Sequence, residues 1–260
     1  MKNIKETLEG IYNNPELRRT VVPLFMSNPG IGKSNIIEDF MKEKGVWIPP
    51  FVLSQRMPFE VTGMAMVDKE RDIMKYYDFD FLNDLKDGSI LFIDETTSSN
   101  PITLNAFLTF LESRVTVSGK ALPDIMIVGA GNYQGILPLT PQVKERFVWY
   151  DEEFYEPMWI EFMVKKHALT EGICKELAKL IHGENFKSKS NNFNTPRSID
   201  KAVNMIIHGV PTPYEDRVKP LLDVQVKNPF NGTVVLPDGT SMEPGDKISW
   251  LDLAKLKRKK

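Results

Sequence analysis

Short apolar runs alternate with segments of helical spacing along the chain up to about residue 150. Each run contains at least four consecutive apolar residues, as expected for strands of a sheet that is covered on both faces. Four such runs predict strands at 20–26, 89–95, 124–132 and 147–153. A fifth predicted strand, 46–54, contains Pro49 and Pro50, which cannot donate ladder hydrogen bonds, and is therefore expected at a sheet edge.

Between these strands the apolar residues recur at the spacing of amphipathic helices. Helices are predicted at 1–19, 33–44 and 100–114. In the last of these, Asn100 is expected to be the N-cap and Pro101 the first helical residue. A small hairpin is predicted at 115–123. Strands that alternate with helices predict an α/β domain over residues 1–152, built on a largely parallel sheet.

The pattern changes after this domain. Amphipathic helices are predicted at 156–167, 171–182 and 196–208. They are expected to form a small all-α domain over 153–209, with a polar loop at 185–194. Residues 210–260 are predicted to be a C-terminal extension, with a hairpin at 232–242 around a Pro-Asp-Gly turn and a short helix with a basic end at 249–260.

Composition narrows the classes of protein that fit. Of the 260 residues, 42% are hydrophobic and 26% are charged, which is ordinary for a globular protein. Cys174 is the only cysteine, which excludes internal disulfides, and His167, His182 and His208 lack the spacing of metal ligands. A net charge of −2 is not the basic footprint of a dedicated nucleic-acid-binding protein. With no long apolar run and no signal-peptide pattern, we expect a soluble cytoplasmic protein without a membrane partner.

The stretch SNPGIGKSN, residues 27–35, lies between the first predicted strand and the helix that follows it. Strand, glycine loop and helix are the setting of a phosphate-binding loop, in which backbone N–H groups and the helix dipole attract phosphates. The residues expected around the phosphates of a nucleotide are Asn28, Pro29, Gly30, Ile31, Gly32, Lys33, Ser34 and Asn35. Ser27 stands where the usual pattern has its first glycine, a position that mainly requires a small residue.

Polar residues end two further predicted strands. Asp94 and Glu95 follow ILFI; the first would hold Mg²⁺ through water, and the second would orient and deprotonate an attacking water. Asn132 follows IVGAG, so its amide would face the terminal phosphate or that water. Because parallel strands bring ligand sites to their carboxyl ends, these residues and the loop are expected at one edge of the sheet. The structural alternatives are an acidic turn and a turn asparagine.

The order SNPGIGKS, ILFIDE, IVGAGN, PQVKERF and NTPRS resembles the MoxR-like branch of the AAA+ ATPases. It is similar in particular to bacterial and phage members that are often encoded beside von Willebrand factor A proteins. The resemblance extends over about residues 15–205 and includes LSQRMPFEVTG, the VTVSGK hairpin and Trp159. It implies a P-loop NTPase of the AAA+ type, with a five-stranded sheet of order 5-1-4-3-2 between helices and a small all-α lid.

The resemblance also implies roles for the matched residues around the nucleotide. Lys33 and Ser34 correspond to the Walker A pair, with Ser34 as a ligand of Mg²⁺. Asp94 and Glu95 correspond to the Walker B pair, in which Asp94 also holds the metal and Glu95 is catalytic. Asn132 corresponds to sensor 1. The implied cofactors are ATP and Mg²⁺.

The resemblance also implies roles for two arginines, and with them a ring-shaped homo-oligomer, expected to be a hexamer. Arg146 corresponds to the arginine finger that reaches the nucleotide of the neighbouring subunit, with Lys144 as a second candidate. Arg197 corresponds to sensor 2 of the lid. Without the resemblance, both arginines are more often ordinary surface residues. The region after residue 209 departs from the usual lid, and residues 62–80 lie where family members carry inserts.

The implied function is Mg²⁺-dependent ATP hydrolysis coupled to remodelling of a protein client, such as a von Willebrand factor A domain protein, in a bacterium or a phage-infected cell. The alternative is a nucleic-acid motor acting on DNA, in which the hairpin at 115–123 projects into a ring pore and Lys120 and the tail KLKRKK offer positive charge. A nucleotide-gated scaffold would not require the catalytic Glu95. A GTPase would carry an N-K-x-D element, which the sequence lacks.

Overall fold

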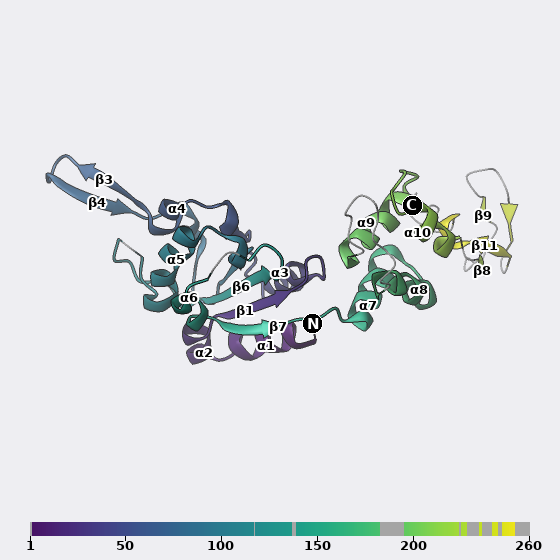
Figure 1. The fold of residues 1–260 in the computed structure, drawn as a ribbon, viewed down its shortest axis with the longest axis horizontal. Helices are drawn as coiled ribbons and strands as arrows, with labels where there is room; N and C mark the ends of the chain where they lie inside the picture. Colours follow the sequence, from purple (N-terminus) through teal and green to yellow (C-terminus); the bar gives the residue numbers. More distant parts are fainter. Residues whose placement is uncertain are drawn as a thin grey trace. The chain divides into compact units, whose positions relative to one another are not determined.

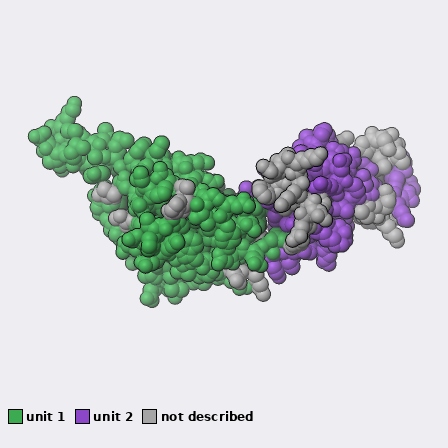
Figure 2. Space-filling view, in the orientation of Figure 1, with its two compact units in different colours: residues 1–154 green, residues 155–260 purple. Residues whose placement is uncertain are grey.

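The computed structural model describes residues 2–116, 118–136, 139–182, 195–223, 225–227, 234–235, 241–243 and 246–252. The chain divides into two compact units, residues 1–154 and 155–260, which are drawn in different colours in Figure 2. Among the helices formed by the described residues, none is long and apolar enough to cross a membrane.

The first unit is built on a five-stranded sheet in which every neighbouring pair of strands is parallel (Figure 1). The strands are β1 Pro23–Ser27, β2 Phe51–Val52, β5 Ile90–Asp94, β6 Met126–Asn132 and β7 Val148–Asp151. Their order across the sheet is β2–β5–β6–β1–β7, which is 5-1-4-3-2 when the five strands are numbered along the chain. The central strands β1, β5 and β6 are buried almost throughout, which explains why their sequences are continuously apolar.

Helices cover both faces of this sheet. They are α1 Lys2–Tyr12, α2 Pro15–Thr20, α3 Lys33–Glu43, α4 Pro58–Thr62, α5 Pro101–Ser113 and α6 Pro141–Glu145, with short 3-10 turns η1 Leu53–Gln55, η2 Asp80–Asp84 and η3 Thr96–Ser98. Leu24 and Leu91 share an apolar cluster with Phe107 of α5. Phe25 and Phe92, which alternate with those leucines and so point to the other face, are also fully buried. The predicted α/β class is therefore correct.

Two predicted elements of this unit differ most from the observed ones. The expected helix at 1–19 is two helices, because Pro15 starts α2 and the Asn14 side chain caps it by accepting from the backbone N–H groups of Glu16 and Leu17. The second strand is only Phe51–Val52, since the two prolines that precede it cannot join a ladder. It does lie at an edge of the sheet, as predicted.

Two hairpins leave the body of the unit. The strands β3 Met64–Asp68 and β4 Ile73–Tyr77 pair antiparallel and project away from the sheet (Figure 1). This hairpin was not predicted, because its apolar residues lie on both faces and stay in solvent; Met66 and Met74, for example, are 54% and 61% exposed. In the hairpin predicted at 115–123, Val115 pairs antiparallel with Ala121.

The second unit begins with helices. They are α7 Glu156–His167, α8 Glu171–His182, α9 Pro196–Ile207 and α10 Glu215–Leu222. The first three lie where the amphipathic pattern predicts them. Helix α10, which was not predicted, contacts α8 and α9 and buries Val218 and Leu222, so helical packing continues past residue 209. Its internal Pro220 and its many charges weaken the helical pattern.

The rest of this unit contains short antiparallel pairs. β8 Gln225–Lys227 pairs with β11 Lys247–Ser249, and β9 Val234–Val235 pairs with β10 Ser241–Met242. The last pair belongs to the hairpin predicted at 232–242, whose turn lies outside the described residues. The polar loop predicted at 185–194 and the basic end of the predicted last helix, 253–260, also lie outside them.

One of the histidines is buried within the helical unit. The Nε2 atom of His167 lies 2.7 Å from Oδ1 of Asp200, and Nζ of Lys166 lies 2.6 Å from the other carboxylate oxygen. Burial alone would raise the pKa of Asp200, but the hydrogen bonds from His167 and Lys166 outweigh it and lower that pKa. The contact between His167 and Asp200 joins α7 to α9, so the burial of this histidine is explained by a structural role.

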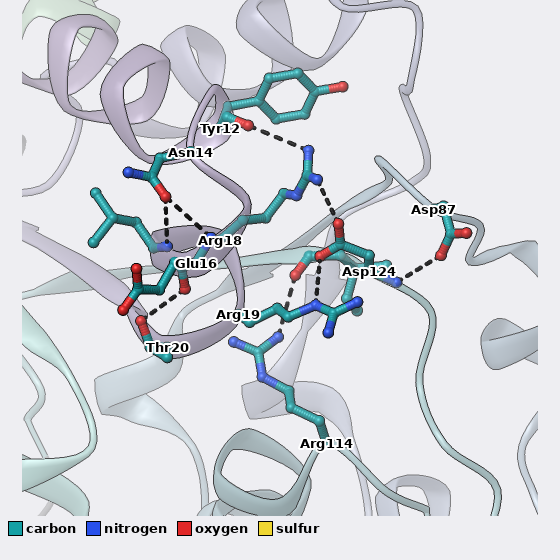
Figure 3. A network of polar contacts seen from close by, with 11 residues as sticks. Tyr12, Asn14, Glu16, Arg18, Arg19, Thr20, Asp87, Arg114 and Asp124 are labelled. Carbon is teal, nitrogen blue, oxygen red and sulfur yellow. Dashed lines mark hydrogen bonds and ion pairs between the residues drawn. The ribbon is translucent and has the colours of Figure 1, made fainter.

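A polar network joins α2 to the loop before β6 in the first unit (Figure 3). Asp124 accepts hydrogen bonds from Nη2 of Arg18 and from Nε of Arg19, the latter at 3.2 Å. Its backbone N–H donates to Oδ1 of Asp87 at 2.7 Å, and Nη1 of Arg114 donates to the carbonyl of Ile125 at 3.3 Å. The Arg18 hydrogen bond is the main reason why the pKa of Asp124 is lowered. Burial lowers the pKa of Arg114 to about 10.

Replacing the carboxylate of this network is expected to destabilise the first unit. Asp124→Asn keeps the shape of the side chain but loses charge-assisted hydrogen bonds to arginines, which should lower the free energy of unfolding by about 1–3 kcal/mol at neutral pH. Because the pKa is lower in the folded state, this stabilisation is present above the unfolded-state pKa, near 3.8, and is lost as the pH falls through the folded value. The difference from wild type should therefore shrink at pH 3.

Denaturant unfolding at pH 7 and pH 3 measures this effect. The matched control is Asp39→Asn. The Asp39 side chain is 70% exposed, and its ion pair with Lys42 in the same helix is long, at 3.6 Å. The control should change the free energy of unfolding by less than about 0.5 kcal/mol. Equal effects of both variants would contradict the assigned role of Asp124.

Candidate functional site

The glycine loop connects the carboxyl end of β1 to the first turn of α3. Gly30 and Gly32 have φ angles of 82° and 106°, in the left-handed region that favours glycine. Gly32 is the N-cap of α3 and makes no side-chain cap, and the first turn contains no acidic residue. The loop therefore presents the positive end of an eleven-residue helix, as an anion-binding loop requires.

Lys33, the first residue of α3, reaches back to the edge of the sheet. Its Nζ donates to Oγ of Ser27 at 2.5 Å and to Oδ1 of Asn132 at 3.0 Å. The residue is only 6% exposed. Ser27 and Asn132 lie opposite each other in the pairing of β1 with β6, so the two acceptors are adjacent. The sequence predicted Lys33 and Asn132 at the same edge of the sheet, but it indicated neither their contact nor the contact of Lys33 with Ser27.

Ser34 lies against the first carboxylate that follows β5. Its hydroxyl donates to Oδ2 of Asp94 at 2.9 Å. Oδ1 of the same carboxylate accepts from the backbone N–H of Glu95 at 2.8 Å. Hydroxyl and carboxylate oxygens are ligands that suit Mg²⁺, which commonly takes one or two protein oxygens together with substrate phosphates. The two residues assigned to the metal are thus in contact, and their chemistry fits this ion.

Glu95 begins the turn η3 with a left-handed backbone, at φ 54°. A non-glycine residue in this conformation costs free energy and is frequent at functional sites. The hydroxyl of Ser54, in the turn η1 that follows β2, donates to Oε2 of Glu95. Sequence reasoning missed Ser54. One signal was available. Ser54 is the last residue of the predicted strand 46–54, and the expected sheet order sets this strand next to the one that ends at Glu95.

The turn after Glu95 packs closely against β6. A Cβ atom on Gly131 would lie 2.6 Å from Oγ1 of Thr97 and 2.7 Å from Sδ of Met26. The Thr97 hydroxyl also donates to the carbonyl of Asn132 at 3.2 Å. Because Gly131 has no side chain, the turn η3, which follows Glu95, can pack directly against the end of β6.

Arg146, the expected arginine finger, is bound within its own unit. It ends α6, and its Nη2 and Nε lie 2.5 and 3.2 Å from Oε2 of Glu112 at the end of α5. Lys144, the second candidate, lies in the last turn of the same helix. Arg197 belongs to the second unit, where it is an exposed residue near the start of α9, after the cap formed by Thr195. The roles of all three residues remain predictions.

Comparisons with known proteins give distant likenesses. No family model matches the chain. An uncharacterized protein of Staphylococcus aureus (strain USA300) is 28% identical over 106 residues, which are 37% of this chain and 40% of that protein. An uncharacterized protein of Methanocaldococcus jannaschii is 24% identical over 176 residues, which are 64% of this chain and 41% of that protein. The matches therefore span well under half the length of these relatives.

Solved structures are similar over more of the chain. The Thermotoga maritima RuvB Holliday junction branch migration motor matches with a TM-score of 0.55 and 16% identity, covering 86% of this chain and 70% of that one. A single-substitution variant of the same RuvB matches with a TM-score of 0.56 and 15% identity, covering 85% of this chain and 69% of that one. At such identities the likeness concerns the fold alone. The chain therefore has an α/β fold similar to that of RuvB.

Proposed function

We propose that this chain is a Mg²⁺-dependent ATPase. The observation that carries the proposal is that consecutive residues of the glycine loop contact the polar ends of two neighbouring strands. Lys33 lies 3.0 Å from Asn132 at the end of β6, and Ser34 lies 2.9 Å from Asp94 at the end of β5. A phosphate cradle, a cation and a pair of oxygen ligands at one sheet edge are the parts that phosphoryl transfer needs.

Each residue then has a role in hydrolysis. The loop backbone and Lys33 bind the β- and γ-phosphates of ATP, and Asn132 orients the attacking water. Ser34 and Asp94 would hold Mg²⁺, which neutralises charge on the phosphates when it is bound. Glu95 accepts a proton from the water, while Ser54 fixes the position of the Glu95 carboxylate before the reaction.

We further propose a ring, expected to be a hexamer, in which Arg146 acts on the nucleotide of the neighbouring subunit. In the single chain this guanidinium is engaged by Glu112, so it would exchange that carboxylate for phosphate oxygens on assembly. Arg197, in the helical lid, is proposed to be sensor 2. The MoxR-like branch is part of this proposal, and so is a protein client, such as a von Willebrand factor A domain protein, that the ring remodels.

A nucleic-acid motor is the second candidate. It is favoured by the likeness in fold to RuvB, which is described as a Holliday junction branch migration motor. The overall charge of −2 does not favour it. Hydrolysis stimulated by single- or double-stranded DNA, together with gel shifts that weaken as salt is raised, would support the motor. No stimulation at low salt would favour the protein client.

Site-directed variants test the ATPase directly. We expect Lys33→Ala to abolish ATP binding, Glu95→Gln to keep binding but lower hydrolysis about 10²–10⁴-fold, and Arg146→Ala to lower it about 10³-fold or more. Lys144→Ala tests the second candidate for the finger, and it should stay close to wild type if Arg146 has that role. Steady-state phosphate release measures all of them. Equal rates in wild type and in the first three variants would disprove the assignment.

Mixing two inactive variants tests whether Arg146 acts between subunits. An Arg146→Ala subunit retains Glu95, and a Glu95→Gln subunit retains Arg146, so a mixed ring contains interfaces that join an intact glutamate to an intact arginine. We expect the mixture to recover a substantial fraction of wild-type hydrolysis, while each variant alone remains inactive. If mixing restores nothing although the variants assemble together, Arg146 does not act on a neighbouring site.

A further inference from the structure

Ser27 departs from the usual loop pattern, and its side chain is part of the site. It is the last residue of β1 and is 0% exposed. Its backbone is held on the β6 side, since the N–H of Tyr133 donates to the Ser27 carbonyl at 3.1 Å. Its Oγ atom lies 2.5 Å from Nζ of Lys33 and 2.7 Å from the carbonyl oxygen of Asn28. The hydroxyl therefore occupies a rigid position between the loop and the helix that follows it.

The hydrogen-bonding capacity of its two partners allows only one orientation of the Ser27 hydroxyl group. An ammonium group can only donate hydrogen bonds, and a carbonyl oxygen can only accept them. The hydroxyl proton of Ser27 must therefore go to Asn28, and its lone pairs accept from Lys33. A glycine at this position has neither group. The usual loop thus lacks an acceptor that this chain supplies beside Asn132.

Burial makes this acceptor important. Lys33 is 6% exposed, and an ammonium group taken out of water is costly unless it is hydrogen-bonded. A lysine side chain also loses rotamer freedom when it is held in one position. Ser27 and Asn132 already hold the Lys33 side chain in the protein without nucleotide. The binding of a phosphate therefore does not require a further loss of rotamer entropy from this side chain.

We propose that Ser27 is a positioning residue, whose hydroxyl holds the Lys33 ammonium in place for the phosphates of the nucleotide. This inference rests on the proposed ATPase function and deepens it. It also revises the expectation that any small residue serves at position 27. Ser27 touches Lys33 and not the reacting atoms, so its loss should act on nucleotide affinity more than on the rate of the bound complex.

Affinity for ATP in the presence of Mg²⁺ tests the proposal, measured in the Glu95→Gln background so that ATP is not consumed. We expect Ser27→Ala, Ser27→Gly and the nearly isosteric Ser27→Cys to bind about 10-fold more weakly, as the loss of one hydrogen bond to a charged group implies. Ser27→Thr and Ser27→Val form a matched pair that differs in the hydroxyl alone. Threonine should bind at least about 5-fold more tightly than valine.

A double-mutant cycle without nucleotide tests the contact independently of ATP. Ser27→Ala should lower the thermal unfolding midpoint of the wild type by a few degrees and should have little effect in a Lys33→Met background. Equal shifts in both backgrounds would mean that Ser27 does not act through Lys33, and would overturn the proposal.

The two failures are distinguishable. If Lys33→Met binds ATP as tightly as its parent, the proposed function fails, whatever the cycle gives. If Lys33→Met loses binding while Ser27→Ala binds as tightly as its parent or more tightly, the function stands and the positioning role is wrong. Tighter binding would mean that the hydroxyl competes with the phosphate for the lysine.

Discussion

The parallel pairing of β1 with β6 is the constraint on which the candidate site depends. Its register sets Ser27 opposite Asn132, and the parallel neighbour β5 ends at Asp94 on the same edge. Parallel strands present their carboxyl ends together, so residues about 100 positions apart along the chain meet there. A slip of one residue would turn these side chains to the opposite face of the sheet. The buried apolar faces prevent that slip, and in this way the core determines the geometry of the site.

Charged side chains have different kinds of partner at two places in the first unit, the network before β6 and the glycine loop. In the network before β6, the Asp124 carboxylate pairs with arginines, so opposite charges compensate each other. At the loop, the Lys33 ammonium donates to the neutral oxygens of Ser27 and Asn132, which lie opposite each other in β1 and β6. The first arrangement stabilises the fold, because the Asp124 carboxylate is paired with arginines. The second holds an ammonium group beside the glycine loop, where the proposed nucleotide would bind.

The elements that the sequence predicted well share one property: their pattern reflects burial. β5 and β6 are continuously apolar because both faces are covered, and α9 is amphipathic because one face is buried. In the elements that were not predicted, the sequence pattern does not reflect burial. The β3–β4 hairpin exposes its apolar side chains, so no alternation marks it. Helix α10 carries an internal proline and a charged surface, and becomes a helix by packing on its neighbours.

The sequence by itself determined the class of the fold and the residue types of the site. Local spacing carries that information, because a strand, a glycine loop and a helix N-terminus follow one another along the chain. Only the tertiary structure decided which side chains touch. The contacts of Ser27 with Lys33 and of Ser54 with Glu95 join separate elements, and a serine has no pattern that reveals its partner. Their positions follow from strand register and from packing, which are properties of the whole sheet.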